Sequence, residues 1–294
     1  MTPSTAHGPT IGVFDSGFGG LTVLRALLAH LPRARFAFLG DTARLPYGSK
    51  SRRTIARYAA ESAQFLVGKE QAEFLVIACN TASALALDAI QAAVPATPVL
   101  GVIEPGADAA VAATRSGDVL VIATDATVQS HAYAAACQAR GLRALEKACP
   151  LLVPLVEEGW TSHPVTEQVI RIYLDELLAV ARDASLNPDT LVLGCTHYPL
   201  LRPLIEAAAP PGMRVIDSAE AAAQAAVRLI HGRAAAPPPV FASFSAERIG
   251  LSPISAGEGS LRFFATDSVD KFQRLGPAFL GRPVPRVQLV DLGG

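Results

Sequence analysis

The sequence predicts an α/β fold made of two similar domains, each with a parallel sheet covered by helices. Short apolar runs of strand length alternate with longer segments of helical periodicity along most of the 294 residues. The strands read as continuous apolar runs, which is typical of parallel sheets that are buried on both faces. A strand that ends in a cysteine followed by a polar residue occurs twice, at Cys79 and at Cys195. The separation of the two cysteines is about the length of one domain.

Each predicted element rests on its periodicity. Residues 35–41 are apolar almost throughout, whereas residues 51–69 repeat apolar side chains at helical spacing. After an Ala/Pro-rich linker that starts at Arg233, two late strands flank one helix. We expect strands within residues 10–17, 35–41, 73–79, 97–105, 118–124, 190–195, 213–219, 261–267 and 284–292. We expect helices at 21–31, 51–69, 81–94, after Pro105, at 128–141 and 166–181, between 195 and 213, and at 269–280.

The bulk composition excludes several classes of protein. Half of the residues are hydrophobic and 17% are charged, so the chain can build a large core. Lys and Arg number 25 against 26 Asp and Glu, without a basic block, which argues against nucleic acid or a membrane surface as a partner. No apolar run reaches the ~18 residues of a membrane span, and the first residues lack the pattern of a signal peptide. We therefore expect a cytoplasmic protein with reduced cysteines.

Cys79 and Cys195 are the candidate reactive residues among four cysteines. The cysteine spacing contains no CxxC pair and no zinc pattern, and we expect Cys137 and Cys149 to be buried as small apolar residues. In open α/β sheets, ligands bind at the carboxyl ends of strands, where Cys79 and Cys195 fall. A helix N-terminus there favours the thiolate, which is the base or nucleophile. One such cysteine would more often be structural, but two in matched settings favour catalysis.

Asp15 heads a Gly-rich loop, "DSGFGG", that follows the first strand. The loop matches neither GxGxxG nor a P-loop, and a carboxylate at its mouth would repel phosphate. Asp15 is better suited to binding an ammonium group or to orienting a proton carrier, although it could simply cap the following helix. Asp41 and Thr124 are also expected at strand ends.

Three further segments offer polar groups near these strand ends. The turn at Pro46, Tyr47 and Gly48 could present backbone N–H groups to a carboxylate, although an ordinary turn would look the same. Glu157 ends an apolar stretch, where a solvated carboxylate is the alternative interpretation. His197 lies two residues after Cys195 and could tune a nearby thiol, whereas most isolated histidines are structural. None of the four lysines is placed for a Schiff base, so we expect neither a cofactor nor a metal ion.

These residues carry a close resemblance to the glutamate racemase family. The segments "FDSGFGGLTV", "GDTARLPYG", "ACNTAS", "ATDATVQSHAY", "CPLLVPLVEEG", "LVLGCTHYPLL", "VIDSA" and "FFATDSVDKF" match the family in order along almost the whole chain. The pair "CNTAS" and "GCTHYPLL" is the most specific part of the match. The tail before Ile11 and the inserted stretch between Arg233 and Leu261 depart from the family, which affects surface and oligomer contacts.

The resemblance implies a cofactor-independent enzyme that interconverts L- and D-glutamate and supplies D-glutamate for peptidoglycan. It implies two pseudo-two-fold related domains that face each other across a cleft: residues 1–103 with 217–294, and residues 104–216. We expect glutamate as the small-molecule partner, a homodimer, and neither nucleic acid nor membrane as a direct partner. By analogy Cys79 and Cys195 are the two acid/base residues, with Asp15 assisting Cys79, and His197 and Glu157 near Cys195. Substrate would be held by Asp15, Ser16, Pro46, Tyr47, Gly48, Asn80, Thr81, Thr124, Thr127, Thr196 and His197.

Two other classes of function compete with racemisation. A thiol hydrolase or amidase could use Cys195 as nucleophile and His197 as base, but it would leave the matching cysteine at position 79 unexplained. A non-catalytic, partner-binding protein is the third class, and nothing in the near-neutral charge supports contact with DNA. Exchange of the glutamate Cα proton in heavy water distinguishes racemisation from both.

Overall fold

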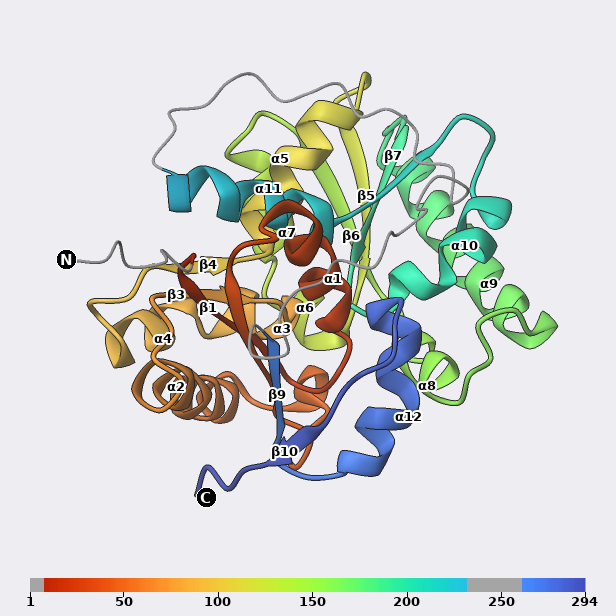
Figure 1. Ribbon diagram of the computed structural model, residues 1–294. Coiled ribbons are helices and arrows are strands. Elements are labelled where there is room, and N and C mark those ends of the chain that lie inside the picture. Colours follow the sequence, from red (N-terminus) through yellow and green to blue (C-terminus); the bar gives the residue numbers. More distant parts are fainter. Residues whose placement is uncertain (1–7, 232–260, 294) are drawn as a thin grey trace.

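The computed structural model describes residues 8–231 and 261–293 and places their strands in two separate, wholly parallel sheets (Figure 1). The prediction of two parallel-sheet α/β domains is confirmed. The first sheet contains β1 (Thr10–Asp15), β2 (Arg35–Gly40), β3 (Phe74–Ile77), β4 (Val99–Gly101), β9 (Leu261–Ala265) and β10 (Val287–Leu289). The second contains β5 (Asp118–Ala123), β6 (Arg143–Ala148), β7 (Thr190–Gly194) and β8 (Arg214–Asp217).

The two sheets repeat one strand order. The first runs β10-β9-β2-β1-β3-β4 and the second β6-β5-β7-β8. When β5 to β8 are matched with β1 to β4, both sheets follow the order second, first, third, fourth. The C-terminal strands β9 and β10 extend the first sheet beyond β2, so both ends of the described chain contribute to it (Figure 1). Strands β3 and β7, which precede the two candidate cysteines, therefore occupy equivalent positions.

Helices follow most strands. Strand β6 and the helices α8 (Leu152–Glu157) and α11 (Ser218–His231) were not predicted, and the predicted elements differ from the observed ones at three further points. The segment 81–94 is two helices that meet at Ala86, whose backbone is not helical (φ −132°, ψ −1°). The segment 128–141 is also divided, because His131 has a left-handed backbone (φ 53°) that no α-helix can include. The α-helices are α1 (Leu21–His30), α2 (Arg52–Gly68), α3 (Asn80–Leu85), α4 (Leu87–Ala93), α5 (Ile103–Ala113), α6 (Asp125–Gln129), α7 (Ala132–Gln138), α8 (Leu152–Glu157), α9 (Pro164–Asp183), α10 (Arg202–Ala208), α11 (Ser218–His231) and α12 (Val269–Leu280).

The third difference lies where the chain first crosses between the sheets. The predicted strand 97–105 covers only β4, and α5 already begins at Ile103. Pro105 lies in the first turn of α5, where a missing N–H costs nothing because that group has no partner within the helix. The start of this helix was therefore not predictable from the sequence, because it lies within an apolar run that ends in a proline.

A continuous hydrophobic core joins the two sheets. One cluster of buried side chains includes Ile11 and Phe38 of the first sheet and Leu120 and Leu193 of the second. Phe279 of α12 belongs to the same cluster. The two halves therefore share buried apolar surface beneath the site as well as two chain connections.

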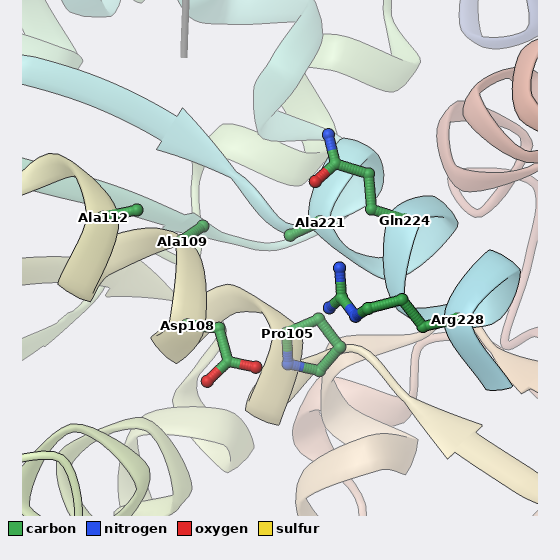
Figure 2. A pocket seen from close by; sticks show the side chains of 7 residues that line it. All are labelled: Pro105, Asp108, Ala109, Ala112, Ala221, Gln224 and Arg228. Carbon is green, nitrogen blue, oxygen red and sulfur yellow. The ribbon is translucent and has the colours of Figure 1, made fainter. Parts of the chain in front are cut away.

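Helices α5 and α11 pack against each other beside these connections (Figure 2). Helix α5 follows the crossover from β4, and α11 follows β8 and returns the chain toward the first sheet. Small residues of α5, Ala109 and Ala112, lie opposite Ala221 of α11 in Figure 2, which lets the two helices approach closely. Both connections between the halves are thus held side by side.

The Ala/Pro-rich linker from Arg233, the insertion that ends before Leu261 and the N-terminal tail to residue 7 lie outside the described residues. The domain boundaries near residues 103 and 217 stay predictions. In the described ranges, no helix is both long and apolar enough to cross a membrane.

Candidate active site

The candidate residues gather at the carboxyl ends of the strands, as predicted. Asp15 is the last residue of β1, and Thr124 follows β5 directly. Cys79 lies two residues after β3 at the N-cap of α3, and Cys195 directly follows β7. Because β3 and β7 are equivalent strands, the two thiols occupy matching positions in the two halves.

Cys79 is buried and hydrogen-bonded at the start of α3. Its thiol donates to Ser16 Oγ over 3.3 Å, and Sγ accepts from the backbone N–H of Ala82 at 3.4 Å. Burial, followed by the charge of Asp15, raises the pKa of Cys79 to about 11, although hydrogen bonding with Ser16 and Ala82 opposes that rise. We expected the helix terminus to lower this pKa. In the structure the loss of solvation outweighs the helix terminus.

Cys195 lies close enough to Cys79 and Asp15 for their charges to act on it. Burial raises the pKa of Cys195 above its ordinary value, and the charges of Cys79 and Asp15 raise it further. The backbone N–H groups of His197 and Tyr198 hydrogen-bond to this sulfur and oppose the rise. Two thiols from different sheets therefore belong to one electrostatic site.

Asp15 is buried between the two halves. Its Oδ2 accepts from the backbone N–H of Gly17 at 2.9 Å, and Oδ1 has no hydrogen-bond partner among the described residues. Burial raises the pKa of the Asp15 carboxyl, while the charge of His197 opposes that rise. Helix α1 has Gly20 at its N-cap and no side-chain cap, so Asp15 is not the N-cap residue of α1. A buried carboxylate with one free oxygen is suited to a cationic ligand.

A chain of charged groups joins His197 to the first half of the molecule. His197 Nε2 lies 3.3 Å from Glu157 Oε1, and Glu157 Oε2 accepts from Lys271 Nζ at 2.7 Å. Burial disfavours ionisation of Glu157, but the hydrogen bonds from His197 and Lys271 outweigh it and lower the Glu157 pKa. Lys271 was not predicted as a site residue, because its partner lies 114 residues away on another helix.

The ring of His197 is not paired with the Cys195 thiol. Its Nδ1 lies 3.4 Å from Thr196 Oγ1, and its Nε2 faces Glu157. The ring also packs against Phe18 and Phe279, with centroids 5.9 Å and 5.1 Å away. A nucleophile–base pair requires the thiol and the imidazole to share a hydrogen bond, so this arrangement disfavours the hydrolase alternative.

Three threonine hydroxyls from the two halves form a triangle. Thr81 Oγ1 lies 3.0 Å from Thr124 Oγ1 and 3.1 Å from Thr127 Oγ1, and the latter two are 3.0 Å apart. Hydroxyls can turn to donate to an incoming carboxylate, so the triangle provides adaptable donors.

The Pro-Tyr-Gly turn borders this triangle. Tyr47–Ser49 form a short 3₁₀ turn, and Gly48 lies against the Thr124 side chain. The phenol of Tyr47 is buried and donates to Asp41, so only the backbone of Tyr47 is available to a ligand. Pro46 precedes the turn and is exposed.

Asn80 presents a free buried donor beside Cys79. Its Oδ1 accepts from the hydroxyl of Tyr133 at 2.7 Å. Its Nδ2 is buried and has no hydrogen-bond partner in the described parts of the chain. An unpaired buried donor costs stability, which is typical of a group that meets a ligand. Tyr133 was not among the predicted site residues.

Both candidate thiols are almost wholly buried. Cys79 and Cys195 expose 6% and 7% of their surface. A surface hollow of about 260 Å³ is lined by Arg53, Thr54 and Arg57, and one of about 30 Å³ lies between α5 and α11 (Figure 2). Predicted site residues line neither hollow, and the smaller one has room for about one water molecule.

Comparison with known proteins finds similarity to racemases in both sequence and fold. The family model described as Asp/Glu/Hydantoin racemase matches residues 12–226. The glutamate racemase of Koribacter versatilis is 52% identical, over 97% of this chain and 98% of its own length.

Two solved structures are similar over nearly their whole lengths. The glutamate racemase of Francisella tularensis, crystallised with D-glutamate, has 34% identity and a TM-score of 0.81, covering 98% of this chain and 99% of its own. The glutamate racemase of Thermus thermophilus, in complex with β-chloro-D-alanine, has 40% identity and a TM-score of 0.76, covering 97% and 98%.

Proposed function

Because the chain belongs to the glutamate racemases of the Asp/Glu/hydantoin racemase family, we propose that Cys79 and Cys195 act as two opposed bases in the racemisation. The observation that carries the proposal is the equivalence of the two thiols. Each follows the third strand of its sheet, and the charge of one acts on the other. Racemisation takes a proton from one face of Cα and returns one to the other. Two bases on opposite faces do this without either crossing the substrate.

Each direction of the reaction uses one thiolate and one thiol. The thiolate of one cysteine removes the Cα proton, and the thiol of the other donates its proton to the opposite face. The roles are exchanged for the reverse direction. After one turnover the protonation states of the two cysteines are exchanged. The first cysteine must therefore lose its proton, and the second must regain one, before the next turnover in the same direction.

The substrate itself helps to generate the thiolate. Burial raises the pKa of both thiols, which favours their neutral forms at pH 7. The ammonium group of glutamate would bring a positive charge beside Asp15, whose free Oδ1 can accept from it. That cation favours the ionised form of a nearby thiol and lowers its pKa. Asp15 therefore orients the ammonium group and supports proton transfer at Cys79.

Fixed donors stabilise the negative charge that develops when the Cα proton leaves. We assign the head group of the amino acid to Ser16, Asn80, Thr81 and Thr196, with Asn80 Nδ2 donating to the α-carboxylate. Such donors are strongest in a closed, water-poor site, and each ~1.4 kcal/mol of stabilisation of the transition state gives about a tenfold rate increase. His197, which is held by Glu157, lies on the Cys195 side and supports proton transfer there.

The remaining donors determine which length of substrate the site accepts. The backbone of the turn at Pro46, Tyr47 and Gly48, with the hydroxyls of Thr124 and Thr127, is assigned to carboxylate oxygens. A substrate whose second carboxylate does not reach these groups leaves them unpaired.

The wider role follows from the same chemistry. We propose that the product D-glutamate is used for peptidoglycan, that the enzyme works in the cytoplasm as a homodimer, and that it needs neither metal nor pyridoxal phosphate. The four free cysteines support a reducing compartment. Growth of a D-glutamate-requiring bacterial strain, rescued by this chain, tests the peptidoglycan role.

The direct test is racemisation by the purified protein after exhaustive chelation and with no pyridoxal phosphate. L-Glutamate should yield D-glutamate by chiral chromatography, up to an equal mixture. Activity that appears only after a metal or cofactor is restored would overturn the cofactor-independent mechanism.

A further inference from the structure

The site residues form two half-sites, one contributed by each half of the molecule. Tyr133 lies between these half-sites and beside both chain connections between the sheets. It belongs to α7 of the second half and is fully buried. Its ring lies next to Gly106 at the start of α5, and its hydroxyl is hydrogen-bonded by Ser218 at the start of α11. Helices α5 and α11 are the two helices that follow the crossovers between the sheets. The Tyr133 side chain thus contacts the start of α5 and the start of α11.

The Tyr133 hydroxyl fixes the orientation of the Asn80 amide. It donates to Asn80 Oδ1 over 2.7 Å in a buried setting. An amide whose oxygen is held by a donor must point its NH₂ group away from that donor. In Asn80 this group is the buried Nδ2 without a partner among the described residues. The hydroxyl of Tyr133 therefore determines where the free donor beside Cys79 points.

The ring of Tyr133 also contacts the strand that leads to Cys195. A Cβ atom added to Gly194 would lie 3.0 Å from Tyr133 Cε2, which is tighter than an ordinary contact. Gly194 is the last residue of β7, directly before Cys195. The absence of a side chain at Gly194 lets the ring approach the backbone closely. The same residue thus borders the Cys195 segment and orients the residue that follows Cys79.

We propose that Tyr133 is a positioning residue for racemisation, which holds the Asn80 amide in the orientation that donates to the substrate head group. This inference rests on the proposed function of the site. Tyr133 does not touch the substrate. It acts through Asn80, and its ring keeps the Cys195 strand at a fixed distance from that amide.

The variant Tyr133→Phe tests the hydroxyl and keeps the ring that fills the core. We expect kcat/KM for glutamate to fall about tenfold, and D-glutamate affinity measured by calorimetry to fall severalfold, as for the loss of one orienting hydrogen bond. Tyr173→Phe is the matched control. Among the described residues the Tyr173 hydroxyl accepts a long hydrogen bond, 3.4 Å from Leu151 N, and none from a predicted site residue, so its loss should leave both values unchanged.

A double-mutant cycle with Asn80→Ala separates positioning from a general structural role. If the hydroxyl acts through Asn80, Tyr133→Phe should have no further effect on kcat/KM or on D-glutamate affinity in the Asn80→Ala background. Additive losses in the two backgrounds, or unchanged kinetics and affinity in Tyr133→Phe alone, would overturn the inference. Thermal unfolding of each variant checks that the fold is retained.

The cycle also separates this inference from the proposed function. Absence of racemisation by the unmodified protein would overturn the proposed function, whatever Tyr133 does. Normal racemisation combined with additive losses would overturn the role of Tyr133 alone. The affinity cycle does not depend on turnover, so it decides the positioning role even where Asn80→Ala is too slow to assay.

Discussion

Gly19 lies in tight contact with Thr196 and His197 of the other half-site, and replacing it with alanine should damage catalysis more than stability. A Cβ atom at this position would collide with Thr196 Oγ1 and would lie 2.6 Å from His197 Nδ1. Ordinary contacts begin near 3.4 Å, so the loop or His197 would have to move by roughly 0.8 Å. The loop is also held by Thr22, whose hydroxyl donates to the Gly19 carbonyl at 3.0 Å and lies 3.4 Å from the Thr196 carbonyl.

The size of the effect follows from that displacement. Misplacing a reacting group by about 1 Å can cost on the order of a hundredfold in rate, and overpacking costs about 1–3 kcal/mol of stability. We therefore expect kcat/KM of Gly19→Ala to fall roughly a hundredfold. A loss of about 1–3 kcal/mol lowers the melting temperature by only several degrees.

The assay is kcat/KM in both directions, with thermal unfolding measured alongside. Gly68→Ala is the matched control: a Cβ there meets no atom within 4 Å, so activity should be unchanged and stability equal or slightly higher. Activity of Gly19→Ala within threefold of the unmodified protein would refute the close packing of the two half-sites during catalysis.

Three other predictions concern the thiols and the substrate. Cys79→Ala and Cys195→Ala should each abolish racemisation while circular dichroism and thermal unfolding stay close to those of the unmodified protein; turnover by either variant would contradict the need for two bases. Burial raises the pKa of Cys79 to about 11, so the reactive thiolate is the minor form at pH 7 and its fraction increases about tenfold per pH unit below that pKa. We therefore expect kcat/KM to rise between pH 7 and pH 9 in a pH–rate profile, and a level profile would argue against a thiolate base in the free enzyme. Aspartate should be used at least about a hundredfold less well than glutamate, because its shorter side chain cannot reach the Pro46–Gly48 turn while Cα stays between the thiols; comparable kcat/KM values would remove the role assigned to that turn.

The sequence predicted the fold well because the fold depends on local periodicity. Buried parallel strands are apolar throughout, so both strands that lead to the cysteines were recognisable. Helix boundaries were less predictable. The break at Ala86 and the left-handed backbone of His131 have no signal in the sequence.

Residues of the candidate site were predictable only where a reactive or polar residue directly follows a predicted strand. Contacts between distant segments were not predictable. Lys271 reaches Glu157 from 114 residues away, and Tyr133 reaches Asn80 from 53 residues away. The direction of the thiol pKa shift was also wrong, because a sequence shows the helix terminus and does not show the depth of burial that outweighs it.

The origin of the proton on the product tests the two-base mechanism most directly. L-Glutamate with protium at Cα is incubated with the enzyme in heavy water, and D-glutamate formed at low conversion is analysed by NMR. If two opposed thiols act, the second thiol supplies deuterium from solvent, so the early D-glutamate should be deuterated at Cα while the remaining L-glutamate keeps its protium. A single base would return part of the abstracted protium to the opposite face. Early D-glutamate that retains protium at Cα would therefore contradict the assignment of Cys79 and Cys195 to opposite faces of the substrate.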